Sequence, residues 1–172
     1  MLTSVKPVVG EYPPYYLKYI ERVPDGDIIE ILSTQINQNI SFLKNLPPEK
    51  LNYRYAEGKW TIKQIVQHLI DGERVFSYRA LRFARNDKTA LPGFEENEYA
   101  DEAQVDNREF SELLSEFEAV RNATLCLLKS FGDEELSRTG IANDNPISVR
   151  SICYIIAGHE LHHIAIIKER YL

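Results

Sequence analysis

The stretch Ala157-Gly158-His159-Glu160-Leu161-His162-His163-Ile164, near the end of the chain, holds three of the four histidines. His159 and His163 are four residues apart, so on an α-helix their side chains lie on one face. They interrupt an apolar row at helical spacing, formed by Val149, Ile152, Ile156 and Ile166. Polar groups that point inward need partners, and a bound metal ion is one such partner.

The fourth histidine, His68, lies far upstream in another segment with helical periodicity. If the two helices face each other, His68, His159 and His163 form a set of three nitrogen ligands. Three protein ligands leave a coordination position open for water or substrate, whereas a closed structural site uses four. The central hypothesis is a catalytic divalent metal bound by these three histidines.

Two alternatives remain open for the histidines. His162 lies about 60° round the helix from His159 and can replace His163 as a ligand. It is further from the apolar row, however, so it is assigned to the edge of the site. Alternatively, all of these histidines are core or surface residues with ordinary hydrogen-bond partners.

The composition is that of a soluble globular protein. Of its 172 residues, 44% are hydrophobic and 27% are charged, and this length favours a single domain. The formal net charge of −6 argues against a nucleic-acid partner, because phosphate binding favours a basic surface. No apolar run is long enough to span a bilayer and the N-terminus lacks a secretory pattern, so we expect a cytoplasmic protein with no membrane partner. Cys126 and Cys153 are expected to be buried free thiols.

Four amphipathic segments predict the architecture. Residues 1–24, rich in tyrosine and proline, are expected to form an arm packed on a single domain of residues 25–172. Helices are predicted over residues 27–46, 61–85, 106–131 and 148–172. No segment has convincing strand periodicity, so the predicted fold class is all-α, a four-helix bundle. The connections 86–104 and 133–147 are long enough to cross the bundle.

Several local signals mark the predicted helices. Thr61 and Gln64 match a T-x-x-Q capping box, and Asp106 with Glu109 matches a D-x-x-E box. Gly72 lies four residues after His68 on the same face, where its missing side chain leaves space beside a ligand or permits close helix packing. Trp60 is interpreted as a hydrophobic staple at the start of its helix rather than as a binding platform.

Further residues are weaker site candidates. Asp71 can orient a ligand or act as a base. Arg79 and Arg82 can bind an anionic thiol or a substrate carboxylate, although arginines on a helix ordinarily pair with surface acids. Glu160 is a candidate because it lies in a match to the H-E-x-x-H pattern of zinc peptidases, in which the glutamate activates water. That pattern arises easily by chance, and residues after His163 offer no histidine or aspartate as a downstream ligand.

Two segments together resemble a known family. WTIKQIVQHLIDGERVFSYRALRFAR from Trp60 and AGHELHHIAIIKERY from Ala157 are similar to the DinB-like superfamily, and the LPGF segment at Leu91 extends the similarity. The resemblance implies a four-helix bundle, often dimeric, with a divalent metal bound by one histidine of the second helix and an H-x-x-x-H pair of the fourth. By motif match these ligands are His68, His159 and His163.

The resemblance also implies a choice of reactions. Members of the superfamily include transferases that use a low-molecular-weight thiol such as bacillithiol, and others described as metal-dependent hydrolases. We expect a thiol transferase acting on a small-molecule substrate as a homodimer, with a hydrolase as the first alternative. A non-enzymatic, stress-related metal-binding dimer is the second alternative. Imidazole ligands suit several metals, with zinc or nickel expected here.

Overall fold

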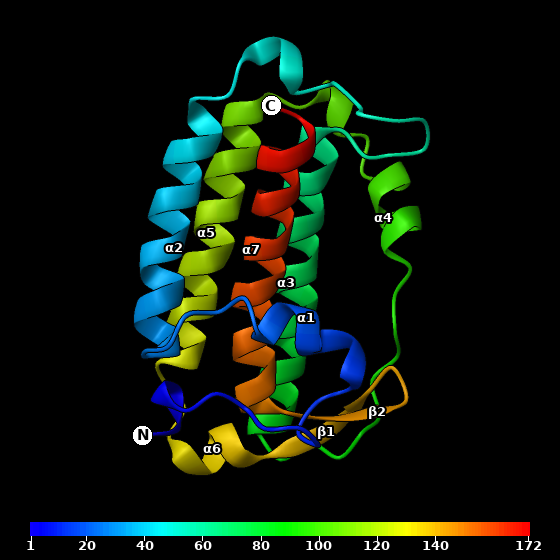
Figure 1. Cartoon of the computed structure of the whole chain (residues 1–172). Helices are drawn as coiled ribbons and strands as arrows, with labels where there is room; N and C mark the ends of the chain where they lie inside the picture. Colours follow the sequence, from blue (N-terminus) through cyan, green and yellow to red (C-terminus); the bar gives the residue numbers. More distant parts are fainter.

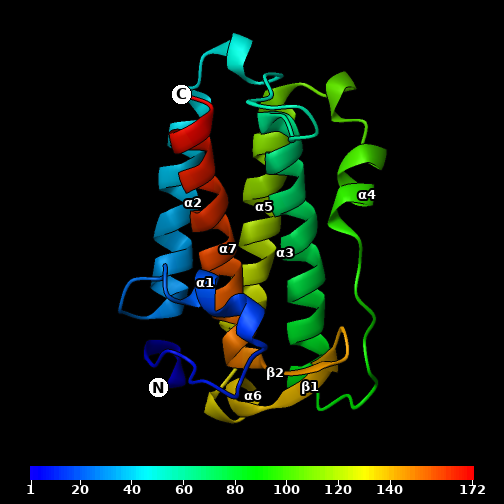
Figure 2. The same ribbon diagram turned by 45° about the vertical axis from the view of Figure 1, so that its right-hand side comes forward.

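Four long helices form the body of the molecule in a computed structural model that describes residues 1–172 (Figure 1). They are α2 (Ile28–Lys44), α3 (Ile62–Ala84), α5 (Phe110–Leu128) and α7 (Val149–Arg170). Each lies within one of the segments predicted from periodicity, and the four-helix bundle is confirmed. Helix α3 packs between α5 and α7, and α2 packs against the same two helices from the opposite side (Figures 1 and 2).

Both long connections cross the bundle, as the sequence predicted, but in different ways: one joins two parallel helices, and the other joins two helices that are not packed against each other along their length. The chain between α3 and α5 runs the whole length of the molecule and carries α4 (Glu96–Glu102), so α3 and α5 are parallel. The chain between α5 and α7 instead stays at one end (Figure 2). It is long because it folds into short elements there, and these close that end of the core.

A β-hairpin in this second connection was not expected from the sequence. Strands β1 (Thr139–Ala142) and β2 (Asn145–Ser148) pair antiparallel through a two-residue turn in which Asn143 and Asp144 have φ values of 49° and 59°. Asparagine and aspartate tolerate this left-handed conformation, which a tight hairpin turn requires. The strands are too short for alternation to be visible in the sequence. The remaining elements are α1 (Leu17–Ile20), α6 (Asp133–Ser137) and the 3-10 turns Leu2–Ser4, Pro14–Tyr16, Pro48–Lys50 and Val105–Asn107.

Three of the four long helices begin with a side-chain cap. The capping box of Thr61 and Gln64 is present, and the Asp27 and Ser148 side chains cap α2 and α7. The predicted box at Asp106 is wrong, because Asp106 lies in a 3-10 turn. The chain becomes extended at Arg108 before α5 begins, so Glu109 is its N-terminal flanking residue.

Helix α7 is buried on all sides over most of its length, including every residue from Val149 to Glu160. Its outer face is covered by α1, and a Cβ atom at Gly158 would overlap the carbonyl oxygen of Tyr19. Glycine is therefore required where the two backbones meet. This close approach fixes the N-terminal segment beside the histidines of α7.

The remaining sequence expectations have mixed outcomes. Cys153 is buried and free as expected, whereas Cys126 is exposed on α5, so the prediction of two buried thiols is wrong for Cys126. None of the helices has the length and apolar character needed to cross a membrane.

Candidate metal centre

A layer of polar side chains divides the core of the bundle into two apolar clusters. On α7, Ala157 belongs to one cluster and Ile164 to the other, and His159, Glu160 and His163 lie between them. On α5, Arg121 similarly separates Phe117 from Leu125. Buried polar groups destabilise a fold unless they have partners, so each polar side chain of this layer needs one.

Three histidines from two helices meet in this layer. One ring nitrogen from each of His68, His159 and His163 lies within 4.8 Å of the other two. The Nε2 atoms of His68 and His159 are 2.8 Å apart, and the three ring centroids are separated by 4.7 to 4.8 Å. The set predicted from spacing is therefore assembled in space, and it contains His163 rather than His162.

Burial keeps the three imidazoles neutral at pH 7. It lowers the pKa of His68 to about 4, and together with the neighbouring imidazoles it lowers the pKa values of His159 and His163. Neutral imidazole is the form that binds a metal. Nitrogens bound to one zinc ion at about 2.0–2.1 Å lie only slightly more than 3 Å apart, so the cluster needs little adjustment to hold one cation.

Aromatic side chains enclose the histidines. The Trp60 ring centroid is 4.7 Å from that of His68 and 6.3 Å from that of His163, and the Tyr19 ring is 5.4 Å from that of His159. Trp60 therefore borders the site as well as the start of α3. These rings shield the imidazoles from bulk water and hold their orientation.

Gly72 allows close helix packing and also leaves space at the site, the two roles considered for it. A Cβ atom there would lie 3.2 Å from Cε1 of His159, which is closer than ordinary van der Waals contact. The space left by the missing side chain is occupied by the ring of His159. Close packing between α3 and α7 at Gly72 therefore positions a histidine of the cluster.

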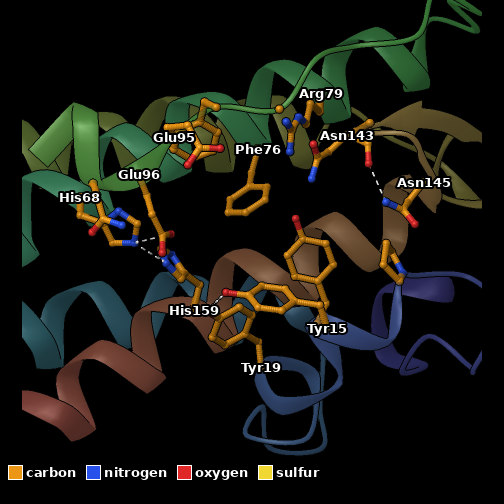
Figure 3. Close-up of a pocket in the computed structure, with 16 residues that line it drawn as sticks. Tyr15, Tyr19, His68, Phe76, Arg79, Glu95, Glu96, Asn143, Asn145 and His159 are labelled. Atoms are coloured by element: carbon orange, nitrogen blue, oxygen red, sulfur yellow. Dashed lines mark hydrogen bonds and ion pairs between the residues drawn. The ribbon is translucent and has the colours of Figure 1, made fainter.

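A cavity of about 330 Å³ reaches His68 and His159 from the side of the molecule (Figure 3). Its walls come from the N-terminal segment, α3, the chain just before and at the start of α4, the hairpin turn and α7. Tyr15 and Tyr19 lie on the side of the cavity opposite Phe76, with Arg79 at the end away from His68 (Figure 3). Tyr16 and Phe94 also line the cavity. No serine, threonine or cysteine lines this cavity.

Glu160 points away from the histidines into a separate buried cluster. Its Oε2 accepts a hydrogen bond of 2.7 Å from Arg121, whose guanidinium also binds both oxygens of Glu73 at 2.8 Å. Asn39 donates to the other oxygen of Glu160 at 2.6 Å, and Gln35 also donates to Glu160. Glu160 thus has no free oxygen for water activation, and the zinc-peptidase interpretation loses its catalytic residue.

Of the other site candidates predicted from the sequence, only Arg79 lines the histidine cavity. Asp71 is half-buried and hydrogen-bonded to Gln67 at 2.9 Å, outside the histidine cavity, and burial raises its pKa. Arg82 pairs with Asp87 and Tyr78 at the surface, as expected of an ordinary helix arginine. Arg79 is different, because it is buried and lines the cavity.

His162 lies at the edge of the site. It is half-buried, and its ring centroid is 5.3 Å from that of Tyr19 and 5.2 Å from that of His163. It is not among the three histidines whose ring nitrogens converge. Its expected position beside the cluster matches this placement.

Glu96 is a site residue that the sequence did not reveal. Its Oε2 lies 3.9 Å from Nε2 of His68, and its side chain enters the cavity from α4 (Figure 3). In the sequence it is one of several acids in the connection 86–104. That connection was expected to be long enough to cross the bundle, and it is a crossover that also supplies a wall of the cavity (Figure 1).

Known proteins share this architecture. The chain is 29% identical over 162 residues to a protein of Oceanobacillus iheyensis named "putative metal-dependent hydrolase", covering 91% of this chain and 92% of that protein. A protein of the same name from Geobacillus thermodenitrificans is 30% identical over 124 residues, with coverage of 70% and 68%.

The fold itself has a solved counterpart. The structure of YfiT from Bacillus subtilis, described as having an unusual four-helix bundle topology, matches with a TM-score of 0.72 at 20% identity. The match covers 98% of this chain and 94% of YfiT. The family model of the DinB superfamily matches residues 31–167, which include all three histidines and all four long helices except the ends of α2 and α7. The chain belongs to the DinB superfamily.

Proposed function

We propose that this protein is a metal-dependent enzyme whose cation is held by His68, His159 and His163. The observation that carries the proposal is the convergence of three neutral imidazoles, two of which, His68 and His159, line an open cavity. A bound divalent cation, zinc or nickel, lowers the pKa of a thiol or of water and so supplies a nucleophile near neutral pH. The names of the relatives support metal dependence.

The proposed nucleophile comes from outside the chain. The cavity wall offers no serine, threonine or cysteine, and Cys153 is buried elsewhere in the core. Burial raises the pKa values of Tyr16 and Tyr19, so these phenols stay protonated at neutral pH. The two remaining nucleophiles are an added small thiol and water.

Transfer to a low-molecular-weight thiol is the first candidate reaction. The cavity of about 330 Å³ falls at the lower end of the range for small-molecule sites, so it has room for an organic co-substrate beside the histidines. Its aromatic side chains can pack against the apolar part of such a molecule. A second organic molecule, rather than a side chain, then provides the attacking atom.

Hydrolysis is the second candidate, and Glu96 favours it. Its carboxylate is near His68 and about half of the side chain is exposed, so it has a free oxygen to take a proton from water. The relatives' names also point to hydrolysis. In a hydrolase Glu96 acts as the general base, whereas thiol transfer has less need of it.

One experiment separates these reactions. Zinc- and nickel-loaded protein is assayed with 1-chloro-2,4-dinitrobenzene and a panel of small thiols, and in parallel with a panel of esters and amides. In thiol transfer, sulfur bonds to the ring carbon, chloride leaves with its bonding electron pair, and the thiol proton passes to solvent. We expect thiol-dependent chloride release that is lost in His68→Ala and kept in Glu96→Gln. Hydrolysis that is lost in Glu96→Gln would favour the second candidate.

A non-enzymatic metal-binding dimer is the outcome that would contradict both. In that case neither panel reacts, and removal of the metal changes only stability. The oligomeric state is measured separately by analytical ultracentrifugation, for which we expect a homodimer.

A further inference from the structure

Arg79 differs from the other buried arginines of the protein. Three arginines are buried, namely Arg79, Arg121 and Arg150. Arg121 pairs with Glu73 and Glu160, and Arg150 pairs with Glu11. Arg79 is 5% exposed and has no carboxylate oxygen within 4.0 Å. The chain supplies no anion for this guanidinium, and none of its nitrogens is a fully buried atom without a partner, so its free donors face the cavity.

The contacts that Arg79 does make leave most of its donors free. One terminal nitrogen donates to the carbonyl oxygen of Pro92 at 2.8 Å, whereas a guanidinium has five N–H donors. Arg79 also interacts with the side chain of Tyr16, whose pKa is raised by burial against the opposing effect of Arg79. Tyr16 is therefore a neutral phenol and supplies no counter-charge.

The unpaired charge of Arg79 lies in the same cavity as His68 and His159. Its side chain points into the cavity beside Asn143, at the end opposite to His68 (Figure 3). Arg79 lies eleven positions after His68 on α3, which corresponds to about 16 Å of helix rise. Helical side chains lean toward the N-terminus, so the guanidinium is tilted toward the histidines.

We propose that Arg79 is a subsite for a carboxylate group, and that the molecule carrying it is extended enough to reach the three histidines with its other end. The planar guanidinium matches a carboxylate in a bidentate arrangement, and the anion supplies the counter-charge that the fold lacks. The position of the reactive end rests on the proposed function, but the anion subsite does not.

The test uses pairs of ligands that differ only at one end. Zinc-loaded protein is titrated by calorimetry with 8-mercaptooctanoic acid and with 8-mercapto-1-octanol. We expect the acid to bind about ten- to a hundredfold more tightly, as for a charge-assisted hydrogen bond. The short 3-mercaptopropionic acid should lack this advantage, because it cannot reach both ends of the cavity.

Variants assign the effect to one residue. Arg79→Gln should abolish the advantage of the acid, and Arg79→Lys should restore part of it by keeping the charge. Arg82→Gln is the matched control, since Arg82 lies one turn further along the same helix and already pairs with Asp87. Equal binding of acid and alcohol to the wild type, or an advantage that persists in Arg79→Gln, would overturn the proposal.

A metal-free arm distinguishes this inference from the proposed function. Suberic acid, which has no thiol, should bind metal-free wild type more tightly than Arg79→Gln. Suppose that zinc raises the affinity for neither thiol above that of metal-free protein, while the affinity for suberic acid still depends on Arg79. In that case the proposed function fails and the anion subsite stands. If suberic acid binds both proteins equally, the subsite itself is contradicted.

Discussion

His159 and Glu160 are neighbours in the sequence and both are buried, but they belong to two different polar clusters. Glu160 joins a cluster in which charges from α3, α5 and α7 are paired and the side-chain amides of Gln35 and Asn39 from α2 complete the hydrogen bonds. His159 joins a cluster of three like imidazoles that has no carboxylate at hydrogen-bond distance and borders a cavity.

The difference separates a structural cluster from a binding site. Burial alone would lower the pKa of Arg121, but Glu160 and Glu73 outweigh it and raise the pKa, so the ion cluster is charged and closed. The histidine cluster is neutral and open on one side, and the carboxylate of Glu96, 3.9 Å from His68, is too far for a hydrogen bond. A cation fits the second cluster and has no place in the first.

The largest expected effect on stability comes from breaking the closed cluster, which is the ion cluster of Arg121, Glu73 and Glu160. Arg121→Ala leaves two buried carboxylates without a cation and should lower the free energy of unfolding by about 3–5 kcal/mol. Urea denaturation followed by circular dichroism measures this. Arg74→Ala, which removes the exposed partner of Glu116, is the control and should cost less than about 1 kcal/mol. Equal losses in the two variants would contradict the structural role assigned to the buried cluster.

A second prediction concerns pH and the open cluster, which is the cluster of His68, His159 and His163. The pKa of His68 is near 6.5 in the unfolded chain and about 4 in the folded protein. Between these values the unfolded chain binds a proton that the folded protein does not. Metal-free protein should therefore lose stability as the pH falls from 6.5 to 4, by about 3 kcal/mol at most for this residue.

The measurement is urea unfolding of chelator-treated protein at pH 7 and pH 4.5. His68→Leu removes the titrating group and should show a smaller loss between the two pH values than wild type. Groups that do not contact His68 titrate equally in both proteins, so the difference reports His68 together with its effect on the pKa values of His159 and His163. The same loss in both would mean that His68 is not held neutral in the folded protein.

A smaller effect should follow from Glu160→Gln, which keeps the shape of the closed cluster and removes one charge. We expect a loss of stability of about 1–2 kcal/mol, because a charge-assisted hydrogen bond becomes a neutral one. Metal content, measured by elemental analysis, should be unchanged. Loss of the metal together with full stability would move Glu160 into the metal site and undo the separation of the two clusters.

The sequence predicted the open cluster better than the closed one. His159 and His163 are recognisable because they occupy inward positions at a spacing of four, and His68 follows from the same periodicity on another helix. Arg121 carried no such signal, since an arginine among the residues of α5 reads as solvent-exposed until its partners on α3 and α7 are known. Partners far apart in the sequence, such as Glu73 and Glu160, have no local pattern that joins them.

The cavity was hidden from sequence reasoning for a similar reason. Its walls are contributed by segments with weak periodicity, including the hairpin turn at Asn143 and the crossover that carries Glu96. Where these segments lie depends on the path of the chain around the bundle, which helical spacing does not define. Gly158 was visible in the sequence, but its contact with Tyr19 could be found only in the folded protein.

The most direct test of the central claim is the metal content of tag-free protein, measured by elemental analysis for wild type, His68→Ala and His163→Ala. If one cation is shared between α3 and α7, the wild type contains close to one divalent metal per chain and both variants contain almost none. Arg121→Leu serves as a control that disturbs the closed cluster without touching the histidines. A wild type without metal even after reconstitution, or metal retained in His68→Ala, would contradict a three-histidine site.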